Sequence, residues 1–109
     1  MPQVSMRGMN PETAVKLAPK IKETVVSVTG TDAKYVTTEY ICSFQMDDTG
    51  ICESFPKVDI LWLTGRPQEM HDALAKALTE LFKNNGFNKL QVTFTNMPPN
   101  YFYDNGEHY

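Results

Sequence analysis

The residue of this sequence with the most distinctive chemistry is Pro2, which directly follows Met1. Methionine aminopeptidase generally accepts a small second residue, and proline qualifies, so removal of Met1 would expose a free secondary amine. Such an amine can act as a general base or form an iminium with a carbonyl. An α-amino group has a pKa of about 8 in water, and burial beside a cation lowers that pKa towards neutrality. The alternative is that Pro2 merely begins an edge strand.

The only two arginines, Arg7 and Arg66, are candidate carboxylate-binding residues. A guanidinium binds a carboxylate through two parallel hydrogen bonds, which suits the recognition of an enolisable acid. Arg66 follows Gly65 between a predicted strand and a predicted helix, a position that favours an anion clamp. For each arginine the alternative is a surface ion pair.

Four further side chains are candidates for a substrate pocket: Glu39, Trp62, Tyr103 and His108. Glu39 could pair with an arginine or serve as a second acid/base group, and a structural ion pair is its alternative. Trp62 could form a pocket wall, although an aromatic residue in a core strand often only packs. Tyr103 and His108 could donate protons or line the pocket, since histidine changes charge near physiological pH. A solvated chain end is the alternative for His108.

The metal-ligating residue types are scattered, so we expect no metal and no cofactor. Cys42 and Cys52 are ten residues apart without a CxxC or CxxH neighbour, and the two histidines, His71 and His108, lie elsewhere. Two reduced thiols are the simple interpretation, with a hairpin disulfide as the alternative. His71 is interpreted as structural. Neither a glycine-rich phosphate loop nor a Ser-His-Asp order is evident.

The composition predicts one globular domain over residues 1–109. Hydrophobic residues make up 41% and charged residues 21%, and the formal net charge is −3 without a basic block. These values exclude a disordered chain and give no sign of a nucleic-acid or membrane partner. No apolar run approaches the roughly 20 residues that span a bilayer, so we expect a cytoplasmic protein.

The elements that would position these residues come in two similar halves. Each half has a strand led by Pro-x-Val, at residues 2–7 and 56–63, followed by a proline with an acidic residue suited to a helix start. Apolar spacing predicts helices over residues 11–28 and 67–85, closed by Gly30 and Gly86. Pro19 should kink or split the first helix.

Two more strands, over residues 37–45 and 90–95, complete two β-α-β units, with a turn at residues 47–50. Two helices can cover only one face of a four-stranded sheet, yet residues 60–63 are apolar on both faces. A second subunit is the natural cover, and this favours an oligomer. The aromatic-rich tail, residues 97–109, is expected to pack, on a neighbouring subunit for example.

Several of these pieces together resemble the tautomerase superfamily, which includes macrophage migration inhibitory factor. The matching pieces are Met1-Pro2 with Arg7, Thr29-Gly30 before Tyr35-Val36, Glu39, Val58 to Trp62 before Gly65-Arg66, and Tyr103 to Tyr109. The closer match is to a bacterial branch of that superfamily.

The resemblance implies an α+β fold: a duplicated β-α-β, giving a four-stranded mixed sheet with two helices on one face, assembled as a symmetric homotrimer. It also implies that Pro2, freed of Met1, moves protons on a small enolisable or unsaturated carboxylic acid, in a pocket at a subunit boundary. Decarboxylase, dehalogenase and hydratase chemistry would use the same parts. Thr31 stands where a lysine is expected, so the usual substrates do not carry over directly. The alternative is a non-catalytic trimer that binds a small ligand or a protein.

Overall fold

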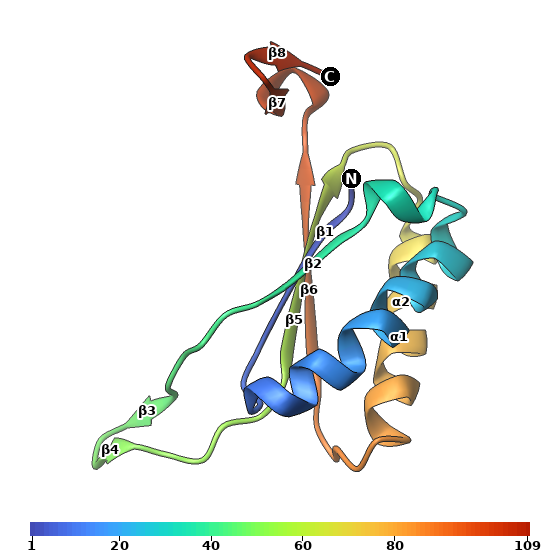
Figure 1. The fold of residues 1–109 in the computed structure, drawn as a ribbon. Coiled ribbons are helices and arrows are strands. Elements are labelled where there is room, and N and C mark those ends of the chain that lie inside the picture. Colours follow the sequence, from blue (N-terminus) through green and yellow to red (C-terminus); the bar gives the residue numbers. More distant parts are fainter.

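A computed structural model describes residues 1–109. The chain folds into a body from which two hairpins project (Figure 1). The elements in chain order are β1 (Gln3–Arg7), α1 (Pro11–Thr29), the 3₁₀ turn η1 (Ala33–Tyr35), β2 (Thr37–Tyr40), β3 (Met46–Asp47), β4 (Gly50–Ile51), β5 (Lys57–Leu63), α2 (Gln68–Lys83), β6 (Gln91–Met97), the 3₁₀ turn η2 (Pro99–Tyr101), β7 (Tyr103–Asp104) and β8 (Glu107–His108).

The body contains a four-stranded mixed sheet with the order β2-β1-β5-β6. Within each half the two strands run parallel, β1 with β2 and β5 with β6, and the halves meet where β1 pairs antiparallel with β5. Each parallel pair is joined through a helix, as a parallel connection requires. The predicted duplicated β-α-β is confirmed.

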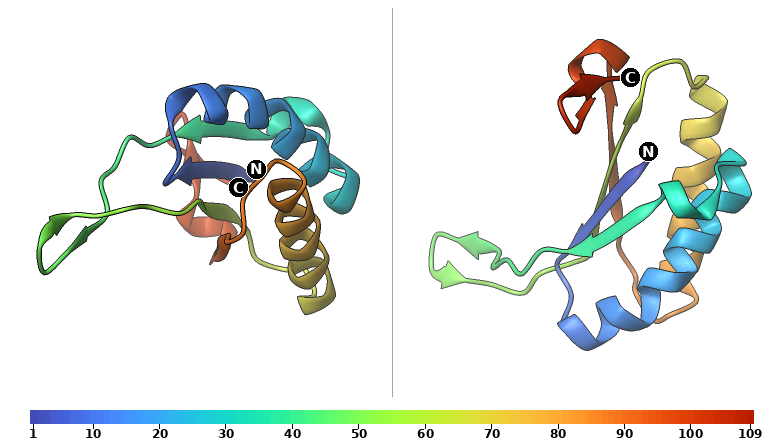
Figure 2. Two further views of the ribbon diagram at one scale, coloured as in Figure 1. Left: turned by 90° about the horizontal axis from the view of Figure 1, so that it is seen from below. Right: turned by 45° about the horizontal axis from the view of Figure 1, so that its top comes forward.

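Both helices cover the same face of the sheet, as the views in Figures 1 and 2 agree. Alternate residues of β1 and β5 point into this layer, because side chains along a strand alternate between the two faces. They pack with the apolar stripes of α1 and α2 to form a single core. Its buried members are Val4, Met6, Ala14, Leu17, Ile21, Val25, Val36, Val58, Ile60, Trp62, Leu74, Leu78 and Phe82.

The first helix begins and ends as predicted but is not broken at Pro19. The Asn10 side chain accepts a hydrogen bond from the Thr13 amide at 2.8 Å, and Gly30 closes the helix in the left-handed conformation. The expected split does not occur: α1 runs without a break from Pro11 to Thr29. Pro19 leaves the Val15 carbonyl without its helical donor, but Val15 is 73% exposed, so water can replace that donor. Neither helix is long and apolar enough to cross a membrane.

The second strand is shorter than predicted. The interval 37–45 was expected to be one strand, but β2 ends at Tyr40. The Ile41 amide still donates to the Met6 carbonyl at 2.8 Å, after which β1 ends and Gly8 turns the chain away. Residues beyond Ile41 therefore have no strand of the four-stranded sheet to pair with, and they leave it.

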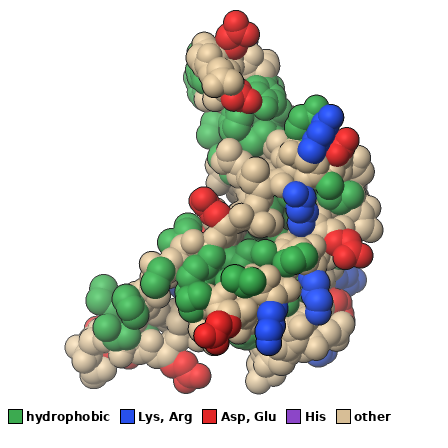
Figure 3. Space-filling model, viewed as in Figure 1, with side chains coloured by type: hydrophobic (Ala, Val, Ile, Leu, Met, Phe, Trp, Pro, Cys, Tyr) green, Lys and Arg blue, Asp and Glu red, His purple; other side chains and the backbone are tan.

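Two hairpins project from the body, and we call them the arm (residues 41–55, with β3 and β4) and the terminal hairpin (residues 103–108, with β7 and β8) (Figures 1 and 2). The radius of gyration is 14.7 Å, whereas a compact domain of this length has about 13 Å. Apolar side chains on the arm face solvent in the single chain: Phe44 is 70%, Met46 73% and Ile51 69% exposed (Figure 3). An isolated two-stranded hairpin is marginally stable in water, so both hairpins lack part of their packing in the single chain.

Candidate functional site

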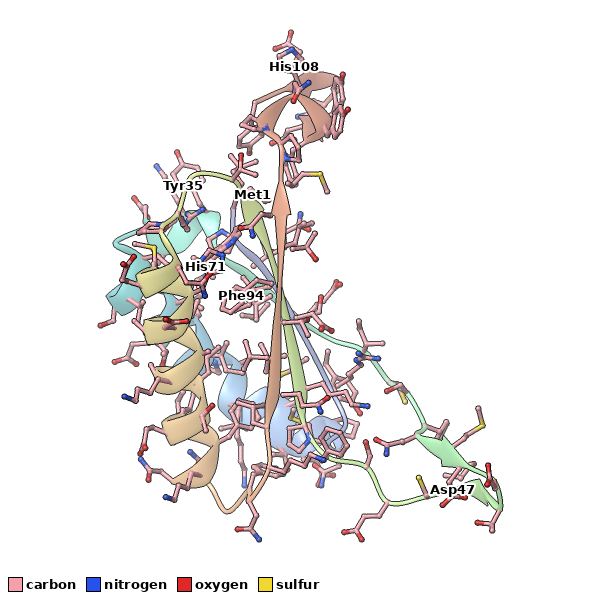
Figure 4. All side chains as sticks on the ribbon, turned by 180° about the vertical axis from the view of Figure 1, so that it is seen from behind. Met1, Tyr35, Asp47, His71, Phe94 and His108 are labelled. Carbon is pink, nitrogen blue, oxygen red and sulfur yellow. The ribbon has the colours of Figure 1, made fainter.

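The amino terminus is held at one end of the sheet, beside η1. The Met1 amine donates a hydrogen bond to the Tyr35 carbonyl at 2.7 Å, and the two residues lie together in Figure 4. Pro2 is fully buried, and its carbonyl accepts a hydrogen bond from the Thr37 amide at 3.2 Å. The nitrogen that removal of Met1 would expose is therefore anchored on the rigid sheet.

Beside the amino terminus lies a pocket of about 290 Å³. It is lined by Met1, Gln3, Lys34, Tyr35, Thr37, Phe102, Tyr103, Asp104 and Tyr109. Four of these residues are aromatic, and one lysine supplies a positive charge. The walls come from the body and from the segment that carries the terminal hairpin, so the pocket depends on how that segment is placed.

Arg66 lies in the loop between β5 and α2 and is close enough to affect the amino terminus. Burial lowers the pKa of the Met1 amine below its usual value of 8.0, and the positive charge of Arg66 lowers it further. Burial also lowers the pKa of Arg66 itself. The guanidinium stacks over the Trp62 ring at 4.6 Å and donates one hydrogen bond, to the Leu63 carbonyl at 3.3 Å. A lowered amine pKa means that more of the neutral, basic form is present near pH 7.

Trp62 belongs to a cluster with His71 and Phe94, with ring centroids 4.8 to 4.9 Å apart. The Trp62 indole donates to Asn96 Oδ1 at 2.7 Å, and His71 Nε2 lies 3.2 Å from the same oxygen. His71 Nδ1 lies 3.0 Å from the Pro67 carbonyl. In Figure 4, His71 and Phe94 lie side by side on the helix-covered side of the sheet. Sequence analysis did not single out Phe94 or Asn96, because only the pairing of β6 with β5 brings them to Trp62.

The two predicted site residues of the tail lie on the terminal hairpin. Tyr103 lines the pocket beside Met1. His108 packs edge-on against Tyr103 with ring centroids 5.7 Å apart, and it lies farther from the body than Met1 (Figure 4). The structure thus brings Pro2, Arg66, Trp62 and Tyr103 to one end of the sheet, with His108 beyond them.

Arg7 and Glu39 lie apart from that end in the single chain. Arg7, at the last position of β1, forms an ion pair with Asp59, Nε to Oδ2 at 3.6 Å, and Asp59 also accepts a hydrogen bond from Thr93. Glu39, on β2, pairs in register with Ser5 on β1, and the Glu39 side chain is exposed. It borders a separate groove between β2 and α1.

No three histidine, cysteine, aspartate or glutamate side chains gather in a way that could hold a metal ion. Cys42 is exposed and Cys52 half-buried, and both are free thiols. What the site offers is an amine, a guanidinium and aromatic walls, which suit proton transfer on a small anionic molecule.

Comparison with solved structures shows the same fold in proteins of low sequence identity. A protein of the DUF1904 type from Sebaldella termitidis ATCC 33386 matches with a TM-score of 0.90 and 22% identity over 100% of both chains. Macrophage migration inhibitory factor of Toxoplasma gondii matches with a TM-score of 0.77 and 18% identity over 98% of this chain and 99% of that one. A fused 4-OT protein, described as an asymmetric trimer, matches with a TM-score of 0.81 and 16% identity over 97% and 94%.

No curated protein sequence matches the chain. The structural likeness to macrophage migration inhibitory factor and to 4-OT confirms the expected tautomerase fold. A family model matches residues 1–108, nearly the whole chain. The chain therefore belongs to the family described as Domain of unknown function (DUF1904), and its fold is that of the tautomerase superfamily.

Proposed function

We propose that this protein is a tautomerase-type enzyme that moves a proton within a small enolisable or unsaturated carboxylic acid. The observation that carries the proposal is the position of the amino terminus, which lies on the pocket and within the electrostatic influence of Arg66. Pro2 is buried at the start of β1. Burial disfavours the charged form of an amine, so a free Pro2 nitrogen would be a competent base near neutral pH.

The proposed reaction is an isomerisation without a net change in composition. The Pro2 nitrogen takes a proton from the carbon next to the carbonyl, and the C–H electron pair forms the enolate. Pro2 then gives this proton to a different atom of the substrate, or releases it to solvent while another donor protonates that atom and regains its own proton from solvent. In both cases Pro2 ends as the neutral amine. Tyr103 and His108 are candidates for the second proton transfer, because both lie on the terminal hairpin and Tyr103 lines the pocket.

Arg66 is proposed to hold the substrate carboxylate, with Trp62 supporting the guanidinium from beneath. Arg66 has no carboxylate partner within its own chain, and its one hydrogen bond goes to a backbone carbonyl. A planar guanidinium with most of its N–H donors free can bind a carboxylate through two hydrogen bonds.

Replacing Arg66 by alanine is expected to weaken binding of phenylpyruvate by about tenfold to a hundredfold, since a hydrogen bond to a charged group is worth about 1.5 to 3 kcal/mol. Binding would be measured by quenching of Trp62, the only tryptophan, or by calorimetry. The matched control is Lys16→Ala, which removes an exposed cation of α1 that does not line the pocket. Equal weakening by both changes, or a large loss of stability in Arg66→Ala, would contradict the assignment.

We also propose that the protein is a homotrimer. The helices leave one face of the sheet uncovered, and the half-buried Leu61 and Leu63 lie on that face, since they alternate with Ile60 and Trp62. Arg7 and Glu39 lie on the same face, where a neighbouring subunit would meet them. The exposed apolar residues of the arm need a cover too.

Light scattering of the purified protein is expected to give three times the chain mass of 12.4 kDa at micromolar concentration. Replacing the arm's Phe44 and Ile51 by serine should shift the protein towards monomer, because both are largely exposed in the single chain. A monodisperse monomer of the unmodified protein would refute the trimer.

One observation favours the non-catalytic alternative, a trimer that binds a ligand or protein without turnover. The Met1 amine has a hydrogen-bond acceptor of its own in the Tyr35 carbonyl at 2.7 Å. If Met1 is retained, the Pro2 nitrogen stays the amide of the Met1–Pro2 peptide bond and has no basicity. Intact-mass measurement of untagged protein separates the two readings, because Met1 is either present or absent.

A further inference from the structure

We propose that Asn96 is a positioning residue: by holding the ring of Trp62 it sets the orientation in which Arg66 meets an anion. The consequence for substrate binding rests on the function proposed above, whereas the positioning itself is a property of the ligand-free protein. Asn96 need not touch the substrate for this role.

The first support is the pairing of Asn96 with Trp62. The two residues are Cα partners in the parallel ladder of β5 and β6, and the indole N–H donates to Asn96 Oδ1 at 2.7 Å. Trp62 is fully buried. An indole has one donor and no acceptor, so the amide must present its oxygen to it. Without that oxygen, a buried donor would be left without a hydrogen-bond partner, which is unfavourable.

The second support is the small number of other constraints on Arg66. Its guanidinium stacks 4.6 Å from the Trp62 ring, and its only hydrogen bond is the 3.3 Å contact with the Leu63 carbonyl. The one ion pair of the chain involves Arg7 instead. The indole face is therefore the main side-chain contact of the guanidinium, and a displaced ring would remove that contact.

The third support is a connection through His71 to the loop that carries Arg66. His71 Nε2 lies 3.2 Å from the same Asn96 oxygen, and Nδ1 lies 3.0 Å from the carbonyl of Pro67, the residue after Arg66. On the other side of Arg66, the Thr64 amide donates to the Met97 carbonyl at 3.0 Å. The loop is thus tied to β6 by a backbone hydrogen bond before Arg66, and after Arg66 the imidazole of His71 lies between the Pro67 carbonyl and the Asn96 oxygen.

The amide oxygen of Asn96 therefore serves two elements at once. It meets the indole from β5 and the imidazole from α2. A hydrophobic side chain of similar size could fill the space but could accept neither contact. This is why the proposal assigns the position to the acceptor and not to the volume of the side chain.

The direct test is nuclear magnetic resonance of the arginine side chains in the ligand-free protein, using Asn96→Leu and Asn96→Asp. Arg66 stacks on an indole, so its side-chain protons should be shifted upfield by the ring current. Asn96→Leu should move them most of the way towards their values in an unstructured peptide. Asn96→Asp keeps an acceptor oxygen and should retain the shift. Arg7, the only other arginine, is the internal reference.

The matched control is Val92→Ala, on the same strand. Val92 is half-buried, packs against the core and pairs with Val58, away from the Trp62 ring. It should lower stability while leaving the Arg66 resonances in place. An unchanged Arg66 shift in Asn96→Leu, or an equal change in Val92→Ala, would overturn the proposal.

A double-mutant cycle on phenylpyruvate affinity then tests the consequence for binding. Asn96→Leu is expected to weaken binding by about tenfold in the natural background and to have little further effect when Arg66 is already alanine, because coupled residues are not additive. If Asn96→Leu does not fold, Trp62→Phe removes the unsatisfied donor, and the pair Trp62→Phe with and without Asn96→Leu should then bind equally.

These measurements separate the two proposals. A wild-type protein that binds no carboxylate, but whose Arg66 shift depends on Asn96, would contradict the proposed function and leave the positioning role supported. The opposite result is also distinguishable. If carboxylate binding depends on Arg66, but the effects of Asn96→Leu and Arg66→Ala are additive and the Arg66 shift does not change in Asn96→Leu, the proposed function is supported and the positioning role is contradicted.

Discussion

Replacing Pro2 by leucine is expected to abolish nearly all proton-transfer activity while leaving the fold intact. Leucine is too large for removal of the preceding methionine, so Met1 would stay and the nitrogen of residue 2 would remain an amide. Loss of a general base lowers the rate by roughly 10² to 10⁴-fold. The readout is the keto–enol conversion of phenylpyruvate followed by absorbance, with intact mass to establish whether Met1 is present.

Pro2→Ala is the matched control for this experiment. Alanine permits removal of Met1 and leaves an amine in the same place, but a primary one without the constraint of the ring. Its activity should fall between those of the unmodified protein and Pro2→Leu. The pH dependence should show a base that is active below the usual amine value, because burial disfavours a charged amine and because Arg66 and burial lower the pKa of the neighbouring Met1 amine.

Labelling provides an independent check that needs no knowledge of the natural substrate. Incubation with 3-bromopropiolate, or with phenylpyruvate and borohydride, should add a single adduct that peptide mapping places on Pro2. A protein that has lost Met1 yet takes no label would argue against the enzyme. Retention of Met1 would instead support the non-catalytic binding module.

Replacing Gly8 by alanine is expected to be among the most destabilising single changes outside the core, at about 3 kcal/mol or more. Gly8 ends β1 with a φ of +85°, a conformation that L-residues rarely adopt. A Cβ at this position would also overlap the backbone carbonyl of Phe55, where the arm returns to the sheet. The nearest atoms of Phe55 belong to the backbone, so they cannot move aside as a flexible side chain could.

Gly30→Ala isolates the backbone part of that effect. Gly30 has a comparable φ of +71°, but a Cβ there would meet nothing within 4 Å. It should cost only about 1 to 2 kcal/mol, the penalty of the left-handed conformation. Urea unfolding of the two variants would measure both values, and equal losses would show that the contact with Phe55 contributes nothing.

The sequence alone was sufficient for the two helices and for the division of the sheet into two similar halves. The apolar stripe of residues 67–85 and the alternation of residues 90–95 are local patterns with periods of 3.6 and 2, and each period identifies its element. The helix start at Asn10 and the helix end at Gly30 also rest on neighbouring residues. Because helices and turns form largely from contacts within a few residues, these features could be predicted without a structure.

The predictions that went wrong each depended on surroundings that the local sequence does not specify. The strand from Thr37 was predicted to continue to residue 45, but β1 ends at Arg7 and provides no partner beyond Ile41. Pro19 was expected to disturb α1, yet it lies on the exposed side of the helix, where water is available. Local pattern does not say which side of an element meets solvent at a given residue, or where a neighbouring strand stops.

The candidate site divides in the same way. Pro2 and Arg66 could be chosen from the sequence, because their side-chain chemistry is evident from residue type and position. Their common location at one end of the sheet, and the bond from Trp62 to Asn96 across 34 residues of chain, were decided only by tertiary structure. That bond follows from the register of β5 with β6, which pairs segments far apart in the chain and so is not contained in either segment alone.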